Sequence, residues 1–209
     1  MTDTAALITA FSTLFIIIDP PGLVPIFIAL TQGMTAPQRR AIATRACLVA
    51  AVLMVVFLFA GEAVLGFIGI SMPAFRIAGG ILLFLTALEM LFQRRQARRA
   101  DNAEEGMAEH EDDPSVFPLA LPLIVGPGAI TTIILLAGQA DGPAGIGAVL
   151  GVLLVILGIV YLAFLSSDVI ARVLGKVGIN ILTRVLGMLL AALAVQFILD
   201  GLRGFGLSG

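Results

Sequence analysis

A single acidic residue stands in the middle of the first long apolar run of the chain, beside three prolines and a glycine. The stretch reads "IIIDPPGLVPIFIALT", residues 16–31, and its acid is Asp19. A charged side chain at the centre of a bilayer costs about 2.5 to 3.5 kcal/mol on insertion scales, so we expect Asp19 to contact an ammonium group, Na⁺ or H⁺. Aspartate is also a good N-cap for a helix that begins after it, and the two roles can coexist.

A second interruption of an apolar run lies in "LPLIVGPGAITTIILL", residues 121–136, where Pro127 stands between two glycines. These residues end one helix and let another begin around Ala129. The start of a helix carries unpaired N–H groups and the positive end of the helix dipole, which favour an anion. Together with the carboxylate at the first break, this arrangement predicts a site for a small amino acid or another small zwitterion.

The predicted site consists of residues at the two breaks, most of which are small. Small residues favour a small ligand and close approach of the backbone. Thr131 and Thr132 follow the second break directly, and their hydroxyls either contact the ligand or bond to their own preceding turn. The predicted contacts for substrate or ion are Asp19, Pro20, Pro21, Gly22, Gly126, Gly128, Ala129, Thr131 and Thr132, with Na⁺ placed at Asp19.

The composition shows what kind of protein positions these residues. Of 209 residues, 59% are hydrophobic and 12% charged, and the mean hydropathy is +1.10. These values are typical of an integral membrane protein. Apolar runs of about 20 residues predict six spans near residues 5–31, 42–68, 74–92, 117–138, 144–167 and 181–202.

The one strongly polar stretch, residues 93–115, reads "QRRQARRADNAEEGMAEHEDDPS". We expect a solvated connector whose mixed charge has no function of its own. Its His110 is the single histidine of the sequence, and without a second histidine or a nearby cysteine we expect no metal site there. The chain therefore divides into a first three-span repeat (1–92), the connector and a second three-span repeat (116–209).

The basic residues predict the orientation in the membrane. When alternate loops are assigned to one side, ten of the twelve Lys and Arg residues fall together, which places them in the cytoplasm. We expect a multi-pass protein of the inner (plasma) membrane, surrounded by lipid, with both termini outside and the connector inside. The ten are Arg39, Arg40, Arg45, Arg94, Arg95, Arg98, Arg99, Arg172, Lys176 and Arg184.

The two halves of the sequence also resemble each other. Residues 65–85 and 174–194 share the pattern L-G-x-x-G-I followed by R-x-x-G, and each half begins with an interrupted span. Because three spans are an odd number, the second half must enter the membrane from the opposite side. The predicted fold is an all-α membrane protein with six transmembrane helices in two inverted repeats, whose spans 1 and 4 are broken near the middle of the membrane.

Several function classes are disfavoured by the same sequence. The net charge of −2 and the scattered basic residues argue against nucleic-acid binding, and the absence of G-x-x-x-x-G-K-[ST] argues against an ATP-driven pump. An intramembrane aspartyl protease needs paired carboxylates, and Asp19 has no evident acidic partner. We therefore expect no enzyme and no cofactor beyond coupling Na⁺ or H⁺. A channel or a non-transporting membrane factor stays open as an alternative, and the sequence indicates no oligomeric state.

Three segments are similar to the MarC family of six-span inner-membrane proteins of bacteria and archaea. They are "GISMPAFRIAGGILLFLTALEMLF", "PLALPLIVGPGAITTIILL" and "RVLGMLLAALAVQFILDGL". The resemblance covers nearly the whole chain except the connector, and it implies a secondary transporter of small neutral amino acids such as glycine and alanine. The first-span motif of that family often reads D-P-x-G-N-x-P, and here Leu23 stands in place of the Asn. If this Asn contacts substrate in relatives, the substitution implies a different specificity.

Overall fold

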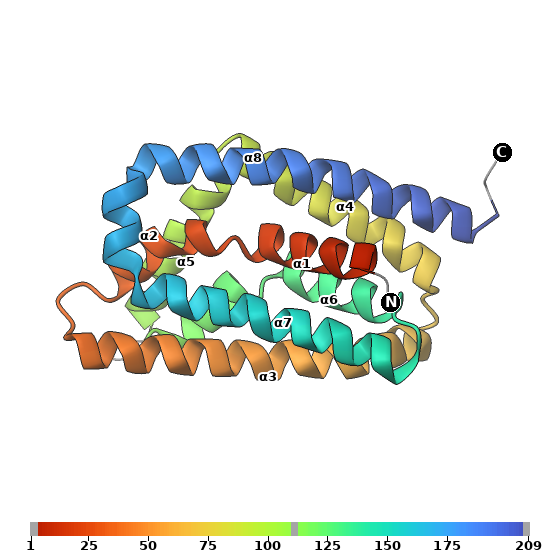
Figure 1. The fold of residues 1–209 in the computed structure, drawn as a ribbon, viewed down its shortest axis with the longest axis horizontal. Coiled ribbons are helices and arrows are strands. Elements are labelled where there is room, and N and C mark those ends of the chain that lie inside the picture. Colours follow the sequence, from red (N-terminus) through yellow and green to blue (C-terminus); the bar gives the residue numbers. More distant parts are fainter. Residues whose placement is uncertain (1–3, 110–112, 207–209) are drawn as a thin grey trace.

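The computed structural model describes residues 4–109 and 113–206, and within these ranges every regular element is helical and no strand occurs. Most of the helices run along one long axis (Figure 1). In chain order the elements are α1 (Thr4–Ile18), α2 (Pro20–Leu30), α3 (Ala36–Ile68), α4 (Met72–Leu91), α5 (Arg94–Glu109), the wide-turn helix η1 (Ser115–Ile124), α6 (Pro127–Ala137), α7 (Gly142–Leu165) and α8 (Ser167–Gly204).

Five helical stretches are long and apolar enough to cross a membrane, and a sixth results if η1 and α6 count as one span bent by 60°. The prediction of an all-α membrane protein is thus confirmed, with up to six spans in the described residues. The five stretches are Thr4–Leu30, Ala36–Ile68, Met72–Leu91, Gly142–Leu165 and Ser167–Gly204. On α3 the exposed apolar side chains of Leu48, Val52, Val56 and Phe59 recur at helical spacing, the pattern of a helix that faces lipid.

The last stretch is longer than the predicted span 181–202, because α8 begins already at Ser167. Inside it Gly175 has φ 59° and ψ 178°, a backbone conformation that glycine adopts more readily than any other residue. The chain bends there, and Figure 1 shows the first part of α8 running across the long axis before the rest follows it. Gly175 belongs to the repeated L-G-x-x-G-I pattern, and in the first copy Gly69 ends α3 with φ 84°.

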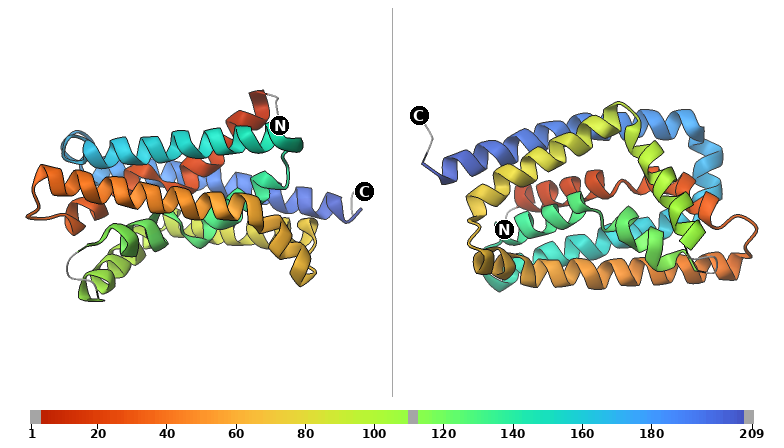
Figure 2. Two further views of the ribbon diagram at one scale, coloured as in Figure 1. Left: turned by 90° about the horizontal axis from the view of Figure 1, so that it is seen from below. Right: turned by 180° about the vertical axis from the view of Figure 1, so that it is seen from behind.

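Helices α4 and α8 pack side by side through glycines, as two views show (Figures 1 and 2). A Cβ added at Gly80 would lie 2.6 Å from Ile198 Cγ1, and one at Gly187 would lie 2.8 Å from Met90 Cβ. Residue numbers increase along α4 in the direction in which they decrease along α8, so the two helices are antiparallel. Small residues of this kind let helix backbones approach closely in a membrane.

The centre of the bundle is formed by α1, α2 and α6, which lie between the α4–α8 pair and the α3–α7 pair (Figures 1 and 2). Their interior side chains, such as Leu14, Leu23 and Ile133, are fully buried. The described ends of the chain, at Thr4 and Gly206, lie at the same end of the bundle, and α5 lies at the other (Figure 1). The break at Asp19 is fully buried, whereas at the second break Val125 is buried and Gly126 is only partly so.

The irregular shape of η1 follows from its prolines. Phe117 and Leu121 have extended backbone angles, with φ near −120° and ψ of 124° and 129°, and each precedes a proline, which disfavours the helical conformation for the residue before it. Pro118 and Pro122 thus act as kinks near the end of the span. The chain between η1 and α6 is not helical, because Gly126 stands before Pro127 and is extended, and the two helices meet at an angle of 60°.

The expectation of a solvated connector is wrong for part of residues 93–115. Most of this stretch is helix α5, which folds back against the bundle, and the side chains of Arg95 and Arg99 are buried. The charged composition is typical of a solvent-exposed segment, but Arg95 and Arg99, one helical turn apart, face the bundle. His110 lies outside the described residues.

Candidate binding site

Asp19 joins two helices and belongs to neither. Its N–H donates to the carbonyl of Phe15, which closes α1, and its own carbonyl accepts from the N–H of Leu23, which opens α2. The residue has φ 57° and ψ 64°, in the left-handed region that aspartate tolerates better than most residues. Its carboxylate accepts from the N–H of Gly22 at 3.2 Å. The predicted N-cap role of Asp19 is confirmed.

The same carboxylate forms a buried ion pair with Arg99. Arg99 Nη1 lies 3.0 Å from Asp19 Oδ2, and the two side chains are 5% and 0% exposed. Arg99 Nη2 also donates to the carbonyl of Ile18 at 2.9 Å. The sequence predicted an ammonium or a cation beside Asp19, and the structure places the guanidinium of Arg99 there.

Arg95, one helical turn before Arg99, reaches the same break. It donates to the carbonyl of Ile17 and, at 3.1 Å, to the sulfur of Met90. The carbonyls of Ile17 and Ile18 are among the last of α1, which have no partner inside the helix. Two arginines from α5 therefore satisfy them and place positive charge at the negative end of the α1 dipole.

The charge of Arg95 has no carboxylate partner within ion-pair distance among the described residues. Helix α5 is not one of the candidate spans, yet this side chain is almost entirely covered. Burial lowers the pKa of the Arg95 guanidinium to about 9. Since this value lies above neutral pH, the group stays cationic under physiological conditions.

A third arginine, Arg98, lies nearer to solvent. Its Nη1 is 2.7 Å from Glu89 Oε1, and its side chain is 56% exposed. The pair connects α5 to the end of α4. An exposed pair of this kind contributes little to stability, but it keeps the guanidinium of Arg98 at the mouth of the cavity described next.

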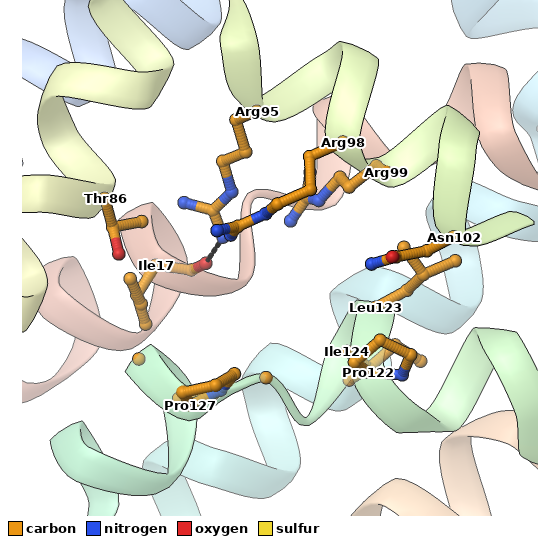
Figure 3. Close-up of a pocket in the computed structure, with 13 residues that line it drawn as sticks. Ile17, Thr86, Arg95, Arg98, Arg99, Asn102, Pro122, Leu123, Ile124 and Pro127 are labelled. Carbon is orange, nitrogen blue, oxygen red and sulfur yellow. Dashed lines mark hydrogen bonds between the residues drawn. The ribbon is translucent and has the colours of Figure 1, made fainter.

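These arginines line a cavity of about 230 Å³ between α5 and the break that separates η1 from α6. Figure 3 shows Arg95 and Arg98 extending from α5 toward the loop before Pro127. The rest of the lining comes from Ile17 of α1, Thr86 of α4, Asn102 of α5, and residues 122–124 and 126–129. The lining thus combines elements from both halves of the chain, and it contains no acidic side chain from the part of the chain that the structure describes.

The floor of the cavity is the N-terminus of α6. Gly126 is the N-cap, it supplies no side-chain cap, and Pro127 follows as the first helical residue. Because proline has no N–H and the N–H of Ile130 bonds to Gly126 O, the N–H groups of Gly128 and Ala129 have no acceptor inside the helix. They are hydrogen-bond donors at the positive end of a helix dipole.

The structure brings only part of the predicted site to this cavity. Gly126, Gly128 and Ala129 line it. Asp19, Pro20, Pro21 and Gly22 form the first break and are linked to the cavity through Arg99, which lines it and binds Asp19.

The two threonines do not line the cavity. The methyl group of Thr131 packs against Gly79 of α4. Thr132 is fully buried, and its hydroxyl has no hydrogen-bond partner in the part of the chain that the structure describes.

Sequence reasoning missed the residues that α5 contributes, Arg95, Arg98, Arg99 and Asn102, as well as Thr86. A signal was present, because Arg95 and Arg99 are four residues apart and so share one face of a helix. A lone acid in an apolar span needs a counter-charge, and this pair was available within the sequence. The acidic and basic residues around Arg95 and Arg99 made this spacing difficult to distinguish from that of a solvated segment.

Comparison with known proteins gives matches along nearly the whole chain. A family model described as MarC family integral membrane protein matches residues 4–205. A UPF0056 membrane protein of Archaeoglobus fulgidus is 44% identical over 201 residues, covering 92% of this chain and 90% of the relative. One from Methanocaldococcus jannaschii is 39% identical over 202 residues, covering 97% and 98%.

A bacterial relative is equally well covered. The UPF0056 inner membrane protein YhgN of Escherichia coli (strain K12) is 38% identical over 197 residues, with 94% of this chain and 96% of the relative aligned. No solved structure matches. The matched region includes both helix breaks and all of α5.

Proposed function

The chain belongs to the MarC family of integral membrane proteins, and from this premise we propose that it is a secondary transporter of small neutral amino acids of the size of glycine or alanine. The observation that carries the proposal is the cavity at the η1–α6 break, lined by α1, α4 and α5 on one side and by η1 and α6 on the other. Its volume of about 230 Å³ is below the range of about 300 to 1,000 Å³ usual for drug-sized ligands, so it suits a small solute.

The proposal includes an inverted repeat with spans 1 and 4 broken near mid-membrane. In many secondary transporters, discontinuous helices from two inverted halves meet at the substrate site. Here the counterparts α4 and α8 run antiparallel, and the α1–α2 pair and the η1–α6 pair are each interrupted. These features support rocking of one half against the other as the route to alternating access.

Coupling to Na⁺ or H⁺ completes the proposed mechanism. The buried charged groups around the first break are Asp19, Arg95 and Arg99. A proton or cation that binds to the Asp19 carboxylate takes the place of Arg99 and so changes the charge balance of this group of residues. An intramembrane protease is disfavoured because the carboxylate of Asp19 faces an arginine, whereas that chemistry needs a second carboxylate.

Uptake into proteoliposomes tests the proposed function. We expect the purified protein to accumulate labelled glycine and alanine under a Na⁺ or pH gradient. Empty liposomes serve as the control. Correctly inserted protein that moves neither glycine nor alanine under any gradient would instead favour a channel or a non-transporting factor.

Labelling of single cysteines tests the proposed placement in the inner membrane, with both termini outside and α5 in the cytoplasm. In a Cys47→Ala background we expect a cysteine at Thr4 to react with a membrane-impermeant reagent in intact cells or spheroplasts. A cysteine at Asp101, which is exposed on α5, should react only after the membrane is opened. The reverse pattern would invert the topology.

A further inference from the structure

The cavity is unusual in its charge. Three arginines of α5 line it, and none of the lining residues that the structure describes is acidic. Two of the three are balanced by carboxylates from outside the lining, since Arg99 pairs with Asp19 and Arg98 pairs with Glu89. One positive charge, that of Arg95, is left over.

Arg95 retains hydrogen-bonding capacity as well as charge. A guanidinium has five N–H donors. Within the described residues Arg95 uses two of them, on the carbonyl of Ile17 and on the sulfur of Met90. Three donors are left for a ligand. A buried arginine with free donors in a planar fork matches the two oxygens of a carboxylate.

A second set of donors lies across the cavity from α5. The N–H groups of Gly128 and Ala129 open α6 without a cap, and these residues line the cavity together with Arg95. Figure 3 shows Arg95 and Arg98 extending from α5 into the space between this helix and the loop before Pro127. A small anion in that space would receive donors from both sides.

We propose that the cavity recognises its ligand by a carboxylate, held between Arg95 and the N-terminus of α6, and that the ammonium group of an amino acid has no acidic partner there among the described residues. The inference rests on the proposed function in taking this cavity as the substrate site. The carboxylate of Asp19 is already engaged in the ion pair with Arg99 and in the hydrogen bond from the N–H of Gly22. The substrate class is therefore small monocarboxylates, within which glycine and alanine are the members that carry an amine.

Three related probes separate the two ends of the ligand. Glycine has a carboxylate and an ammonium group, acetate has only the carboxylate, and glycinamide has only the ammonium group. At fixed ionic strength and pH, we expect glycine and acetate to raise the thermal unfolding midpoint of the purified full-length protein by mass action. Glycinamide should leave the midpoint unchanged.

Two arginine variants on the same helix locate the effect. Arg95→Gln removes the charge and the fork, so we expect the Kd for acetate and glycine to rise by about tenfold or more. Arg94→Gln is the matched control, because Arg94 is exposed and does not line the cavity, and its Kd values should equal those of the wild type. If Arg95→Gln does not fold, the charge-conserving Arg95→Lys should fold and bind both ligands more weakly, since lysine lacks the planar fork.

The outcomes also separate this inference from the proposed function. Stabilisation by acetate without any amino acid uptake would leave the carboxylate site standing and remove the transport proposal. Glycine uptake that glycinamide inhibits and acetate does not would overturn the carboxylate site while leaving transport intact. Equal Kd values in wild type and Arg95→Gln would likewise overturn it.

Discussion

Replacing Asp19 with asparagine is expected to destabilise the folded protein by about 3 to 5 kcal/mol, the usual cost of removing one partner of a buried ion pair. Arg99, with a side chain only 5% exposed, would be left inside the bundle without its counter-charge. Asparagine is itself a good N-cap and tolerates the left-handed conformation. The loss should therefore come from the charge and not from the helix break.

The matched test is a double-mutant cycle on Asp19 and Arg99, with thermal midpoints or unfolding in mixed detergent as the measurement. Asp19→Asn and Arg99→Gln should each destabilise strongly, and the double variant should recover a large part of the loss. As a control, Asp200→Asn breaks the exposed pair with Arg203 and should cost no more than about 1 kcal/mol. Additive effects at positions 19 and 99 would contradict the ion pair.

Ligand binding by the double variant decides what else Asp19 does. Because Arg99 itself lines the cavity, the reference is the Arg99→Gln protein. If Asp19 only caps α2 and balances Arg99, the Asp19→Asn/Arg99→Gln protein should bind glycine with the same Kd as Arg99→Gln. If it contacts an ammonium group or Na⁺, as the sequence predicted, binding or the Na⁺ dependence of uptake should be lost even in the stable double variant. Protonation or cation binding at Asp19 would then have to displace Arg99.

Local rules were enough to predict where the chain breaks. An aspartate before two prolines places the end of one helix and the start of the next within one or two residues, and the structure has the break at Asp19. The same holds for Gly126 and Pro127 at the start of α6. These features depend on backbone conformations of neighbouring residues, which the sequence specifies directly.

The partners of those breaks could not be predicted in the same way, because they depend on tertiary contacts. The charged composition of residues 93–115 predicted that the whole stretch is solvated. An average over the stretch does not reveal the few positions that face inward. Only Arg95 and Arg99, on one face of α5, are deeply buried among the described arginines. The bend at Gly175 was missed for a related reason, since a glycine in an apolar segment is as compatible with a straight helix as with its end.

The inverted repeat stays a prediction, and its matched glycines have different neighbours in the two halves. Gly187 meets Ala87 and Met90 across the α4–α8 contact, and it is the repeat counterpart of Gly79, which receives Thr131 of α6. The two glycines thus serve contacts with different helices. The halves share a sequence pattern, and the cavity has contributions from both, but within the described ranges the arginines of α5 come from the first half alone.

Gly22→Ala is expected to have an effect comparable to the loss of Asp19. A Cβ at this position would lie 2.0 Å from Asp19 Oδ2 and 2.9 Å from Arg99 Nη1, so the carboxylate must leave its place and the ion pair must separate. In an open helical position alanine is more stable than glycine by roughly 0.5 to 1 kcal/mol. We expect Gly22→Ala to reverse that sign and destabilise by about 3 kcal/mol or more.

The control and a second background make this prediction specific to the ion pair. Gly151→Ala lies inside α7 with no atom within 4 Å of the new Cβ, and it should be neutral or stabilising. In an Asp19→Gly/Arg99→Gln background, where glycine keeps the left-handed conformation and no carboxylate meets the new methyl group, Gly22→Ala should lose most of its cost. An equal cost in both backgrounds would mean that position 22 excludes a side chain because of the helix packing around it, and that the Asp19–Arg99 pair does not depend on this glycine.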